Sequence, residues 1–273
     1  MDHNKKERLD VLLVKRNLVE SRQKAKTAIL NGLVFVNGER QDKKAGSLFE
    51  ENVSIELKKE PLTYVSRGGL KLEKALETFQ ISLDGLFCID IGASTGGFTD
   101  CMLSHKAKKV VAIDVGTNQL APKLKKEERV ISMEQTNIRY VTPKQIGQMA
   151  QFVSIDVSFI SLTKIFAPVF SLMEEGASLV CLVKPQFEAG KGRVGKKGIV
   201  RESAIHKEVI EQVLLSAIQN GFQFYGFTFS PVKGSGGNIE YLLYLKKQTK
   251  QEHIEKVWEL VESTVETAFQ TLH

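Results

Sequence analysis

The chain has 273 residues, a hydrophobic content of 42% and a formal net charge of +6. This length allows one large buried core and a small accessory domain, and the charge suits a polyanionic partner, although an ordinary soluble surface also carries such an excess of lysine. Because no apolar run reaches the roughly 20 residues needed to cross a bilayer and no signal peptide begins the sequence, we expect a cytoplasmic protein without a membrane partner.

Residues 1–58 predict a small α+β domain. Apolar residues at helical spacing indicate a helix over residues 7–16, and a second helix is expected to begin after Ser21, its N-cap, and to end at Gly32. A short β segment follows and ends in the Asn-Gly signal of a hairpin. Residues 53–57 then alternate with period two, which predicts a further strand.

Basic side chains gather on the two predicted helices of this domain. They are Arg8, Arg22, Lys24 and Lys26. Such residues on one helical face can match the spacing of phosphates, and structured RNA is recognised mainly through contacts of this kind, whereas a plain solvated face is the alternative reading. The domain resembles the S4 domain, a small RNA-binding fold, in its segments Arg8-Leu-Asp10, Ser21-Arg-Gln-Lys-Ala25 and Gly32-Leu-Val-Phe-Val-Asn-Gly38. The resemblance implies that the basic residues contact RNA.

A charged stretch with a proline and no periodicity predicts a linker at residues 59–66, followed by a larger domain at 67–273. There a helix over 69–79 precedes strand-like segments that alternate with helical ones, which is typical of a Rossmann-like, doubly wound α/β fold with a parallel sheet. Two late β segments flank a Gly-rich turn and are expected to pair antiparallel, before a last helix from about Gln251. Seven strands ending in a hairpin are the usual shape of methyltransferases that depend on S-adenosylmethionine (SAM). The predicted strands are 87–91, 109–114, 130–133, 152–156, 179–183, 221–229 and 239–245.

A strand that stops at a turn of small residues is how a nucleotide-type cofactor is usually held. The run 87–91 opens into Gly-Ala-Ser-Thr-Gly-Gly, whose glycines allow a tight turn before a helix that begins with free N–H groups. The spacing departs from the Gly-x-Gly-x-x-Gly of dinucleotide sites, so the turn suits SAM as well as a pyrophosphate, and a purely structural turn stays an alternative. The residues expected around the methionine end of SAM are Asp90, Gly92, Ser94, Gly96 and Gly97.

Three later residues complete the predicted cofactor site. Asp114 ends the second strand of the sheet, where a carboxylate suits the two hydroxyls of a ribose. Asn137 follows the third strand and would contact the adenine, although an asparagine there serves equally well to cap its own loop. Asp156 ends the fourth strand, where the methyl donor and the acceptor should meet.

Four charged residues stand at the ends of apolar segments in the larger domain: Lys71, Asp156, Lys184 and Glu240. Since ligands bind beyond the carboxyl ends of parallel strands, those that follow strands are predicted to face one crevice. Two lysines and two carboxylates that met there would compensate the cost of one another's burial. Taken singly, each is more simply explained by a surface ion pair or a helix-cap contact.

Together the four residues match, in order and setting, the Lys-Asp-Lys-Glu tetrad of FtsJ-like ribose 2′-O-methyltransferases. With the S4-like domain in front, the chain resembles the TlyA family, historically called haemolysin A, from residue 7 to the final helix. The resemblance implies a SAM-dependent enzyme that methylates cytidine 2′-hydroxyls in 16S rRNA, 23S rRNA or both, with ribosomal RNA or subunits as partner and no required protein partner. One departure is Tyr64, which stands before Val65 where family members carry a tryptophan.

A ribose 2′-hydroxyl is a poor nucleophile at neutral pH, so the site must help remove its proton during in-line methyl transfer. Lys184 is the candidate base in its neutral amine form, with Lys71 as the neighbouring cation and the two carboxylates positioning both lysines. The alternative role is electrostatic: Lys184 as an ammonium stabilises the developing alkoxide while the proton leaves by another route.

The residues from Lys184 to Arg201 are rich in glycine and cations and predict a substrate loop. Its glycines would permit closure, and its basic side chains would hold phosphates near the reacting ribose, with a plain solvated loop as the alternative. These basic residues are Lys191, Arg193, Lys196 and Lys197.

Three other functions stay open at this point. A noncatalytic RNA-binding or ribosome-assembly factor would keep the fold without needing the tetrad. A membrane-active haemolysin, suggested by the family's older name, would need a long apolar or strongly amphipathic segment that the sequence lacks. A NAD-dependent oxidoreductase fits the glycine turn but not the four charged residues.

Neither a metal site nor a disulfide framework is expected. The histidines are scattered, and no His, Cys and Asp cluster has the spacing of metal ligands. The three cysteines, Cys88, Cys101 and Cys181, lie within apolar segments without paired spacing, so we expect reduced packing residues.

Overall fold

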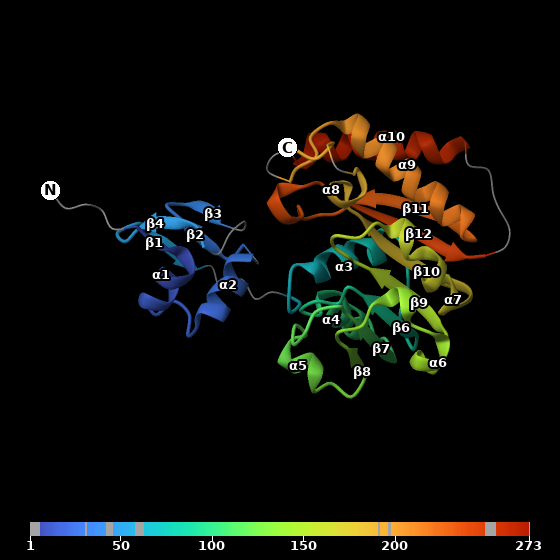
Figure 1. Cartoon of the computed structure of the whole chain (residues 1–273), viewed down its shortest axis with the longest axis horizontal. Helices are drawn as coiled ribbons and strands as arrows, with labels where there is room; N and C mark the ends of the chain where they lie inside the picture. Colours follow the sequence, from blue (N-terminus) through green and yellow to red (C-terminus); the bar gives the residue numbers. More distant parts are fainter. Residues whose placement is uncertain are drawn as a thin grey trace. The chain divides into compact units, whose positions relative to one another are not determined.

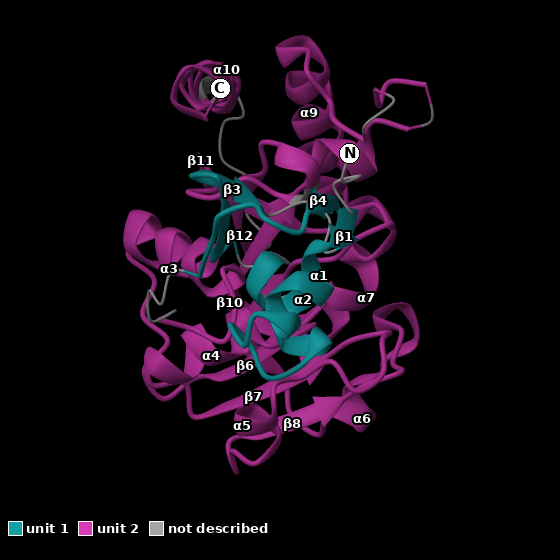
Figure 2. Cartoon of the chain, turned by 90° about the vertical axis from the view of Figure 1, so that its left-hand side faces the viewer, with its two compact units in different colours: residues 1–62 teal, residues 63–273 magenta. Residues whose placement is uncertain are grey.

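The computed structural model describes residues 6–30, 32–41, 46–57, 63–190, 192–195, 198–248 and 255–272. The chain divides into two compact units, residues 1–62 and 63–273, which Figure 2 distinguishes by colour. Of the linker predicted at 59–66, the first part lies outside the described residues. Residues 63–66 belong to the larger unit, where Tyr64 is buried, so this end of the predicted linker is packed against the larger domain.

The smaller unit combines two helices with short antiparallel strands. Its elements are β1 (Lys6–Arg8), α1 (Leu9–Lys15), α2 (Arg22–Leu30), β2 (Val34–Val36), β3 (Glu39–Gln41), β4 (Leu48–Glu50) and β5 (Ile55–Leu57). Strand β1 pairs with β4, and β2 lies between β3 and β5 (Figure 1). The Ser21 hydroxyl accepts a hydrogen bond from the Lys24 amide at 3.2 Å, as an N-cap does. Apolar side chains of α1, α2 and β2 form a core of their own.

Seven strands in the described part of the larger unit form one sheet. They are β6 (Phe87–Ile91), β7 (Lys109–Ile113), β8 (Val130–Met133), β9 (Ala150–Ile155), β10 (Met173–Val183), β11 (Phe222–Phe229) and β12 (Tyr241–Lys247). Their order across the sheet is β11-β12-β10-β9-β6-β7-β8 (Figure 1). Strands β6 to β10 run parallel, and β12 is antiparallel to both β10 and β11. The predicted seven-stranded, mostly parallel sheet with a terminal hairpin is confirmed.

Helices cover both faces of this sheet (Figure 1). Side chains alternate between the faces, so that Ile89 joins a core with α7, α9 and α10, while its neighbour Cys88 joins a core with α3 and α4. The helices are α3 (Gly68–Phe79), α4 (Gly97–Ser104), α5 (Pro122–Lys125), α6 (Pro143–Ile146), α7 (Phe166–Ser171), α8 (Pro185–Glu188), α9 (Ser203–Gln219) and α10 (Glu255–Leu272), with 3-10 turns at η1 (Ile138–Tyr140), η2 (Leu162–Lys164) and η3 (Ser235–Gly237).

All three cysteines lie buried in the larger unit as unpaired thiols. Burial raises the pKa of the Cys88 thiol to about 12, which keeps it protonated and unreactive at neutral pH. The expectation of reduced packing residues is therefore confirmed.

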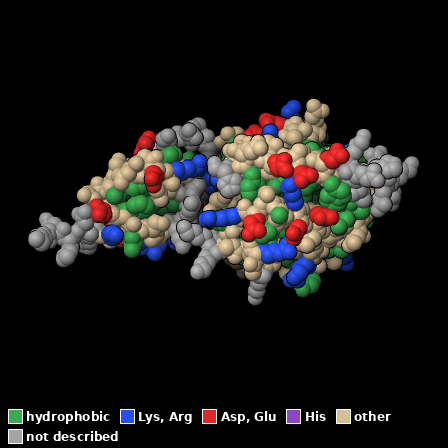
Figure 3. Space-filling model, turned by 90° about the horizontal axis from the view of Figure 1, so that it is seen from above, with side chains coloured by type: hydrophobic (Ala, Val, Ile, Leu, Met, Phe, Trp, Pro, Cys, Tyr) green, Lys and Arg blue, Asp and Glu red, His purple; other side chains and the backbone are tan. Residues whose placement is uncertain are grey.

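Acidic and basic side chains are interspersed over the face of the larger unit that Figure 3 shows from the side of α9 and α10. Lys207 on α9 pairs there with Glu262 and Glu266 on α10, at 2.7 and 3.2 Å. Exposed pairs of this kind contribute little stability, and they leave this face without a uniform sign of charge. Among the described helices, none combines the length and the apolar character that a membrane span requires.

Helices α3 and α4 approach each other closely at Gly97. A Cβ atom on Gly97 would lie 2.3 Å from the Ser66 hydroxyl oxygen and 2.9 Å from the backbone nitrogen of Gly69. A hydroxyl can rotate away but a backbone nitrogen cannot, so only a residue without a side chain permits this approach. The glycine-rich turn therefore fixes α3 on α4 in addition to any role toward a ligand.

We expect Gly97→Ala to destabilise the protein by about 1–3 kcal/mol, because the added methyl group forces α3 and α4 apart. The measurement is the midpoint of urea unfolding monitored by circular dichroism. Gly68→Ala is the matched control, since its Cβ would come no closer than 3.3 Å, to the rotatable Ser66 hydroxyl. Equal midpoints for the two variants would contradict the packing role of Gly97.

Candidate active site

The parallel strands bring four chain segments to one edge of the sheet. Strands β6, β7, β9 and β10 end there, and the residue that follows each of them is polar or glycine. These residues are Gly92, Asp114, Asp156 and Lys184. Because the strands pair in parallel, these four positions lie beyond the same edge, where ligands of open α/β sheets bind.

The turn after β6 has the backbone that its glycines were predicted to supply. Gly92 has a φ of +81°, and a Cβ there would lie 2.4 Å from the carbonyl oxygen of Asp156. Ser94 also has a positive φ, +48°, and its amide donates to the Asp114 carboxylate at 2.8 Å. The turn is thus tied to the ends of the two strands on either side of β6.

A pocket of about 410 Å³ opens at this edge. Five of the predicted cofactor residues line it: Gly92, Ser94, Asp114, Asn137 and Asp156. Apolar side chains, among them Ile113, Val115 and Ile138, form much of the remaining wall. A concave, mostly apolar pocket with a few polar groups is typical of a small-molecule or cofactor site.

Asp90, Gly96 and Gly97 were also predicted around the cofactor, but they do not line this pocket. Gly96 has a φ of +92° and forms the N-cap of α4, where a Cβ would lie 2.3 Å from Leu124. Asp90 is fully buried and accepts hydrogen bonds from the amide and hydroxyl of Thr99, at 2.9 and 2.7 Å, and from the Ser154 hydroxyl at 3.1 Å. Asp90 and Gly96 therefore fix the position of the turn through contacts with α4, β9 and Leu124, outside the pocket.

Asp114 and Asn137 both face the pocket and both bind backbone amides. Besides the bond from Ser94, Asp114 accepts one from the Gly116 amide at 2.7 Å. Asn137 accepts from the Arg139 amide at 3.1 Å and so caps the turn η1, the structural alternative considered for it. A carboxylate oxygen has more than one lone pair, so these bonds orient Asp114 and leave it able to accept from a ligand.

The structure brings Lys71, Asp156, Lys184 and Glu240 together at the side of this pocket. The Lys71 Nζ lies 2.6 Å from Glu240 Oε2 and 3.9 Å from Asp156 Oδ2. Lys184 forms an ion pair with the other oxygen of Asp156. Asp156 therefore stands between the two lysines, and since it also lines the pocket, it joins the charged cluster to the ligand space.

Burial and pairing act in opposite directions on these groups. Burial lowers the pKa of Lys71, but the Asp156 and Glu240 carboxylates outweigh burial and raise that pKa overall. Burial raises the pKa of Asp156, but Lys71 and Lys184 outweigh it and lower that pKa overall. Lys71 therefore remains a cation and Asp156 a carboxylate at neutral pH.

Several neighbours of the cluster were not predicted from the sequence. The Gln186 side chain donates to Glu240 Oε1 at 3.0 Å, and the Lys184 amine donates to the Ser158 hydroxyl at 3.3 Å. Gly234 gives Glu240 its space, since a Cβ there would lie 1.9 Å from Glu240 Oε1. Both polar neighbours sit two residues from a predicted catalytic residue, which was the only signal for them.

Phe159 is a second unpredicted feature of the pocket wall. Its side chain is 91% exposed, its φ is +65°, and its ring lies 4.9 Å from the ring of Phe187 on α8. A large apolar residue that is both exposed and held in the left-handed region is uncommon and points to a functional site. The exposed ring offers a flat surface beside the charged cluster.

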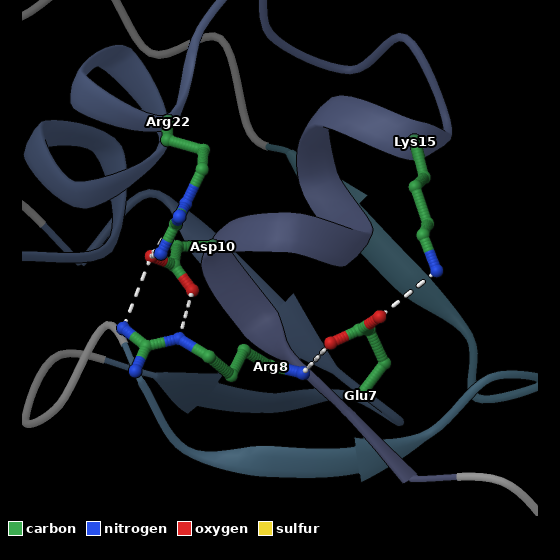
Figure 4. Close-up of polar contacts among 5 residues, drawn as sticks. All are labelled: Glu7, Arg8, Asp10, Lys15 and Arg22. Atoms are coloured by element: carbon green, nitrogen blue, oxygen red, sulfur yellow. Dashed lines mark hydrogen bonds and ion pairs between the residues drawn. The ribbon is translucent and has the colours of Figure 1, made fainter.

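The predicted RNA-contacting residues differ in their surroundings. Arg8 and Arg22 both bind the carboxylate of Asp10 (Figure 4). Lys24 pairs with Glu20, and Arg193 pairs with Glu208, while Lys26 is exposed on α2. Lys191, Lys196 and Lys197 lie outside the described residues.

The far end of the predicted substrate loop is held by buried groups. The Asn238 side chain donates to the Gly198 carbonyl at 2.8 Å and accepts from the Val200 amide at 3.1 Å. The buried His206 ring contacts the Val200 carbonyl at 3.0 Å and the Tyr241 hydroxyl at 2.8 Å. This end of the loop is therefore fixed to the start of β12, directly beside Glu240.

No group of three or more His, Cys, Asp or Glu side chains suited to a metal ion occurs in the part of the chain that the structure describes. Three ion pairs, Lys71–Asp156, Lys71–Glu240 and Lys184–Asp156, link the charged residues at the side of the pocket.

Comparison with known families agrees with the two units. Residues 64–247 match the FtsJ-like methyltransferase family, and residues 7–45 match the S4 domain. The first match spans the strands and all four members of the charged cluster. The second includes both helices of the smaller unit.

Relatives of known name match along nearly the whole chain. YqxC of Bacillus subtilis, which is named for rRNA methyltransferase activity, is 49% identical over 271 residues, covering 98% of this chain and 96% of YqxC. The 16S/23S rRNA (cytidine-2′-O)-methyltransferase TlyA of Mycobacterium tuberculosis is 40% identical over 242 residues, covering 89% of this chain and 90% of TlyA. A solved structure of a Streptococcus thermophilus protein that carries the name hemolysin has a TM-score of 0.77 at 48% identity, covering 98% of this chain and 97% of that one.

The buried Asp90 predicts a pH-dependent effect of Asp90→Asn. Burial raises the pKa of Asp90 from 3.8 to about 6 in spite of its hydrogen bonds, so the wild-type protein loses stability as the pH rises from about 4 to 6, whereas asparagine has no proton to lose. The free energy of unfolding of the variant, relative to wild type, should therefore increase by up to about 3 kcal/mol between pH 4 and pH 7.

Urea unfolding at both pH values measures this difference. Asp84→Asn, at an exposed position, is the control for the change in net charge. A difference between Asp90→Asn and wild type that stays constant from pH 4 to pH 7 would show that Asp90 is ionised without penalty in the folded protein.

Proposed function

Since the chain belongs to the TlyA family, in which an S4 domain precedes an FtsJ-like methyltransferase domain, we propose that it methylates ribosomal RNA. The donor is SAM, and the acceptor is the ribose 2′-hydroxyl of a cytidine in 16S rRNA, 23S rRNA or both. The observation that carries this proposal is the convergence of Lys71, Asp156, Lys184 and Glu240 beside one pocket. A ribosomal substrate would place the protein in the cytoplasm.

The pocket residues fit SAM. Gly92 and Ser94 would hold its amino acid portion against the turn, and Asp114 would accept hydrogen bonds from the ribose hydroxyls. Ile113, Val115 and Ile138 give an apolar wall that suits the adenine. When bound, SAM supplies a methyl group on a positively charged sulfonium, and Asp156 lies at the boundary between this pocket and the charged cluster.

The charged cluster acts on the acceptor hydroxyl. Lys184 is the candidate for the proton acceptor or for the group that stabilises the alkoxide. Asp156 and Ser158 hold its amine at the side of the pocket. Because Asp156 and Ser158 fix the position of this amine, an electrostatic role, in which an ammonium stabilises negative charge that develops on the 2′-oxygen, needs no movement of the side chain. Either role requires the amine at this position.

The other three residues hold Lys184 and the acceptor in place. Asp156 binds Lys184 directly. Lys71 pairs with both Asp156 and Glu240, so that the two lysines and the two carboxylates balance one another's charge. Gln186 in turn orients Glu240. Such preorganised charges accelerate a reaction because they need no rearrangement as the charge on the substrate moves.

An RNA substrate is supported from both units. The smaller unit matches the S4 domain and exposes basic side chains. In the larger unit, the exposed ring of Phe159 lies at the pocket, and aromatic rings of this kind stack on unpaired bases. A base displaced from its helix would bring its ribose hydroxyl to the cluster.

The proposal is tested by methyl transfer from radiolabelled SAM to purified 30S and 50S subunits, followed by mapping of 2′-O-methyl positions. Incorporation of label at a cytidine ribose in either RNA is the expected result. Label on a base, or no incorporation into either subunit with protein that binds them, would overturn it in favour of a base methyltransferase or an RNA-binding assembly factor.

We expect Lys184→Ala to slow single-turnover methyl transfer by roughly 10²–10⁴-fold, because the alkoxide loses its proton acceptor or its charge partner. SAM binding, measured by calorimetry, should change little. Lys164→Ala removes an exposed lysine at the end of the turn η2 and is the matched control. A Lys184→Ala variant that binds SAM and RNA and methylates at the wild-type rate would rule out both roles of Lys184.

A further inference from the structure

A fully buried carboxylate lies beneath the two arginines of the smaller unit. Asp10 has no exposed side-chain surface, yet Arg8 and Arg22 keep 44% and 56% of theirs. Arg8 binds it with two nitrogens, Nε to Oδ1 at 2.9 Å and Nη2 to Oδ2 at 3.2 Å. Arg22 binds Oδ2 with Nη2 at 3.0 Å and Nε at 3.3 Å. Both guanidinium groups therefore meet at one oxygen atom.

This arrangement fixes two flexible side chains in one place. An exposed arginine loses much rotamer freedom when it binds a ligand, unless its guanidinium is already held. Arg8 comes from the end of β1 and Arg22 from the start of α2, so the carboxylate also joins two elements that are separate in the chain. Gly46 allows the chain to pass close over Arg8, since a Cβ there would lie 2.9 Å from Arg8 Nη2.

Arg8, Arg22 and Asp10 together carry a net charge of +1, and both arginine side chains remain partly exposed. Asp10 stays ionised at every pH at which RNA is stable, because the hydrogen bond from Arg8 lowers the pKa of Asp10 to about 2. Each guanidinium has five N–H donors, of which Asp10 uses two. The remaining donors are those that a phosphate group accepts in a bidentate manner.

We propose that Asp10 is a positioning residue that clasps Arg8 and Arg22 into one preformed binding site for a backbone phosphate of RNA. This inference rests on the proposed function, since it assumes that the smaller unit binds RNA, and it adds the site and the residue that organises it. Asp10 does not touch the phosphate. It acts through the two arginines.

The substitution Asp10→Asn tests the proposal by the sign of its effect. Removing a negative charge near RNA should strengthen binding if charge alone matters. If Asp10 positions the arginines, an asparagine presents an amide in place of one oxygen, releases a guanidinium and weakens binding. We expect an affinity for deproteinised ribosomal RNA that is lower on the order of tenfold, and a salt dependence of log K that falls by about one phosphate contact.

Glu20→Gln is the matched control, because it removes one negative charge from the same unit, where Glu20 is exposed and pairs with Lys24. Its affinity should equal or exceed that of wild type. Filter binding of the full-length protein at several salt concentrations gives both quantities. Equal or tighter binding by Asp10→Asn overturns the proposal.

Arg22→Lys keeps the result interpretable if Asp10→Asn is poorly folded. It retains the charge but cannot hold two donors on Asp10 and present others outward. Weaker RNA binding by this variant, with an unchanged midpoint of thermal unfolding, supports the clasp, and wild-type affinity contradicts it. These are binding measurements, so they stand apart from the proposed methyl transfer, which fails only if wild-type protein does not label ribosomal RNA.

Discussion

The site depends on the mutual compensation of four charged side chains that the fold removes from water. An isolated ion inside a protein carries a penalty of several kcal/mol, so neither the lysines nor the carboxylates would remain buried alone. Asp156 forms ion pairs with both lysines, and Glu240 forms a second ion pair with Lys71. Because the members follow β9 and β10, precede β12 and lie on α3, the sheet must be assembled before the charges can meet. The chemistry is therefore inseparable from the folding of the larger unit.

The glycine-rich turn performs two tasks with different residues. Gly92 and Ser94 line the pocket, whereas Gly96 and Gly97 let α4 start at a close approach to its neighbours. Asp90, in the strand before the turn, binds Thr99 on α4 and Ser154 on β9. Only part of the glycine-rich motif is therefore available to a ligand. The other part fixes the packing of α4, and this packing sets the shape of the pocket before a ligand binds.

Much of the fold was predictable because its strands are apolar runs separated by helical segments. The start of β10 was missed because Glu174, Glu175 and Gly176 interrupt the apolar pattern, and the strand itself is irregular there: Gly176 has a φ of +80° and the pairing with β9 shifts register between Met173 and Ser178. Asp156 and Lys184 could be found from their positions after strands, whereas Lys71 on α3 and Glu240 before β12 were found only because all four residues match a known tetrad. Phe159 could not be found, and Gln186 was indicated only by its place two residues after Lys184. Their roles arise from contacts between segments that follow different strands, and such proximity leaves little mark on local sequence.

Gly234 affects the charged cluster only through the space that it leaves empty. Its missing methyl group leaves the volume that the Glu240 carboxylate fills. Any larger residue there would compete with an acid for the same space, and through that acid would disturb Lys71. The identity of position 234 therefore constrains the charged cluster even though this residue carries no ionisable group.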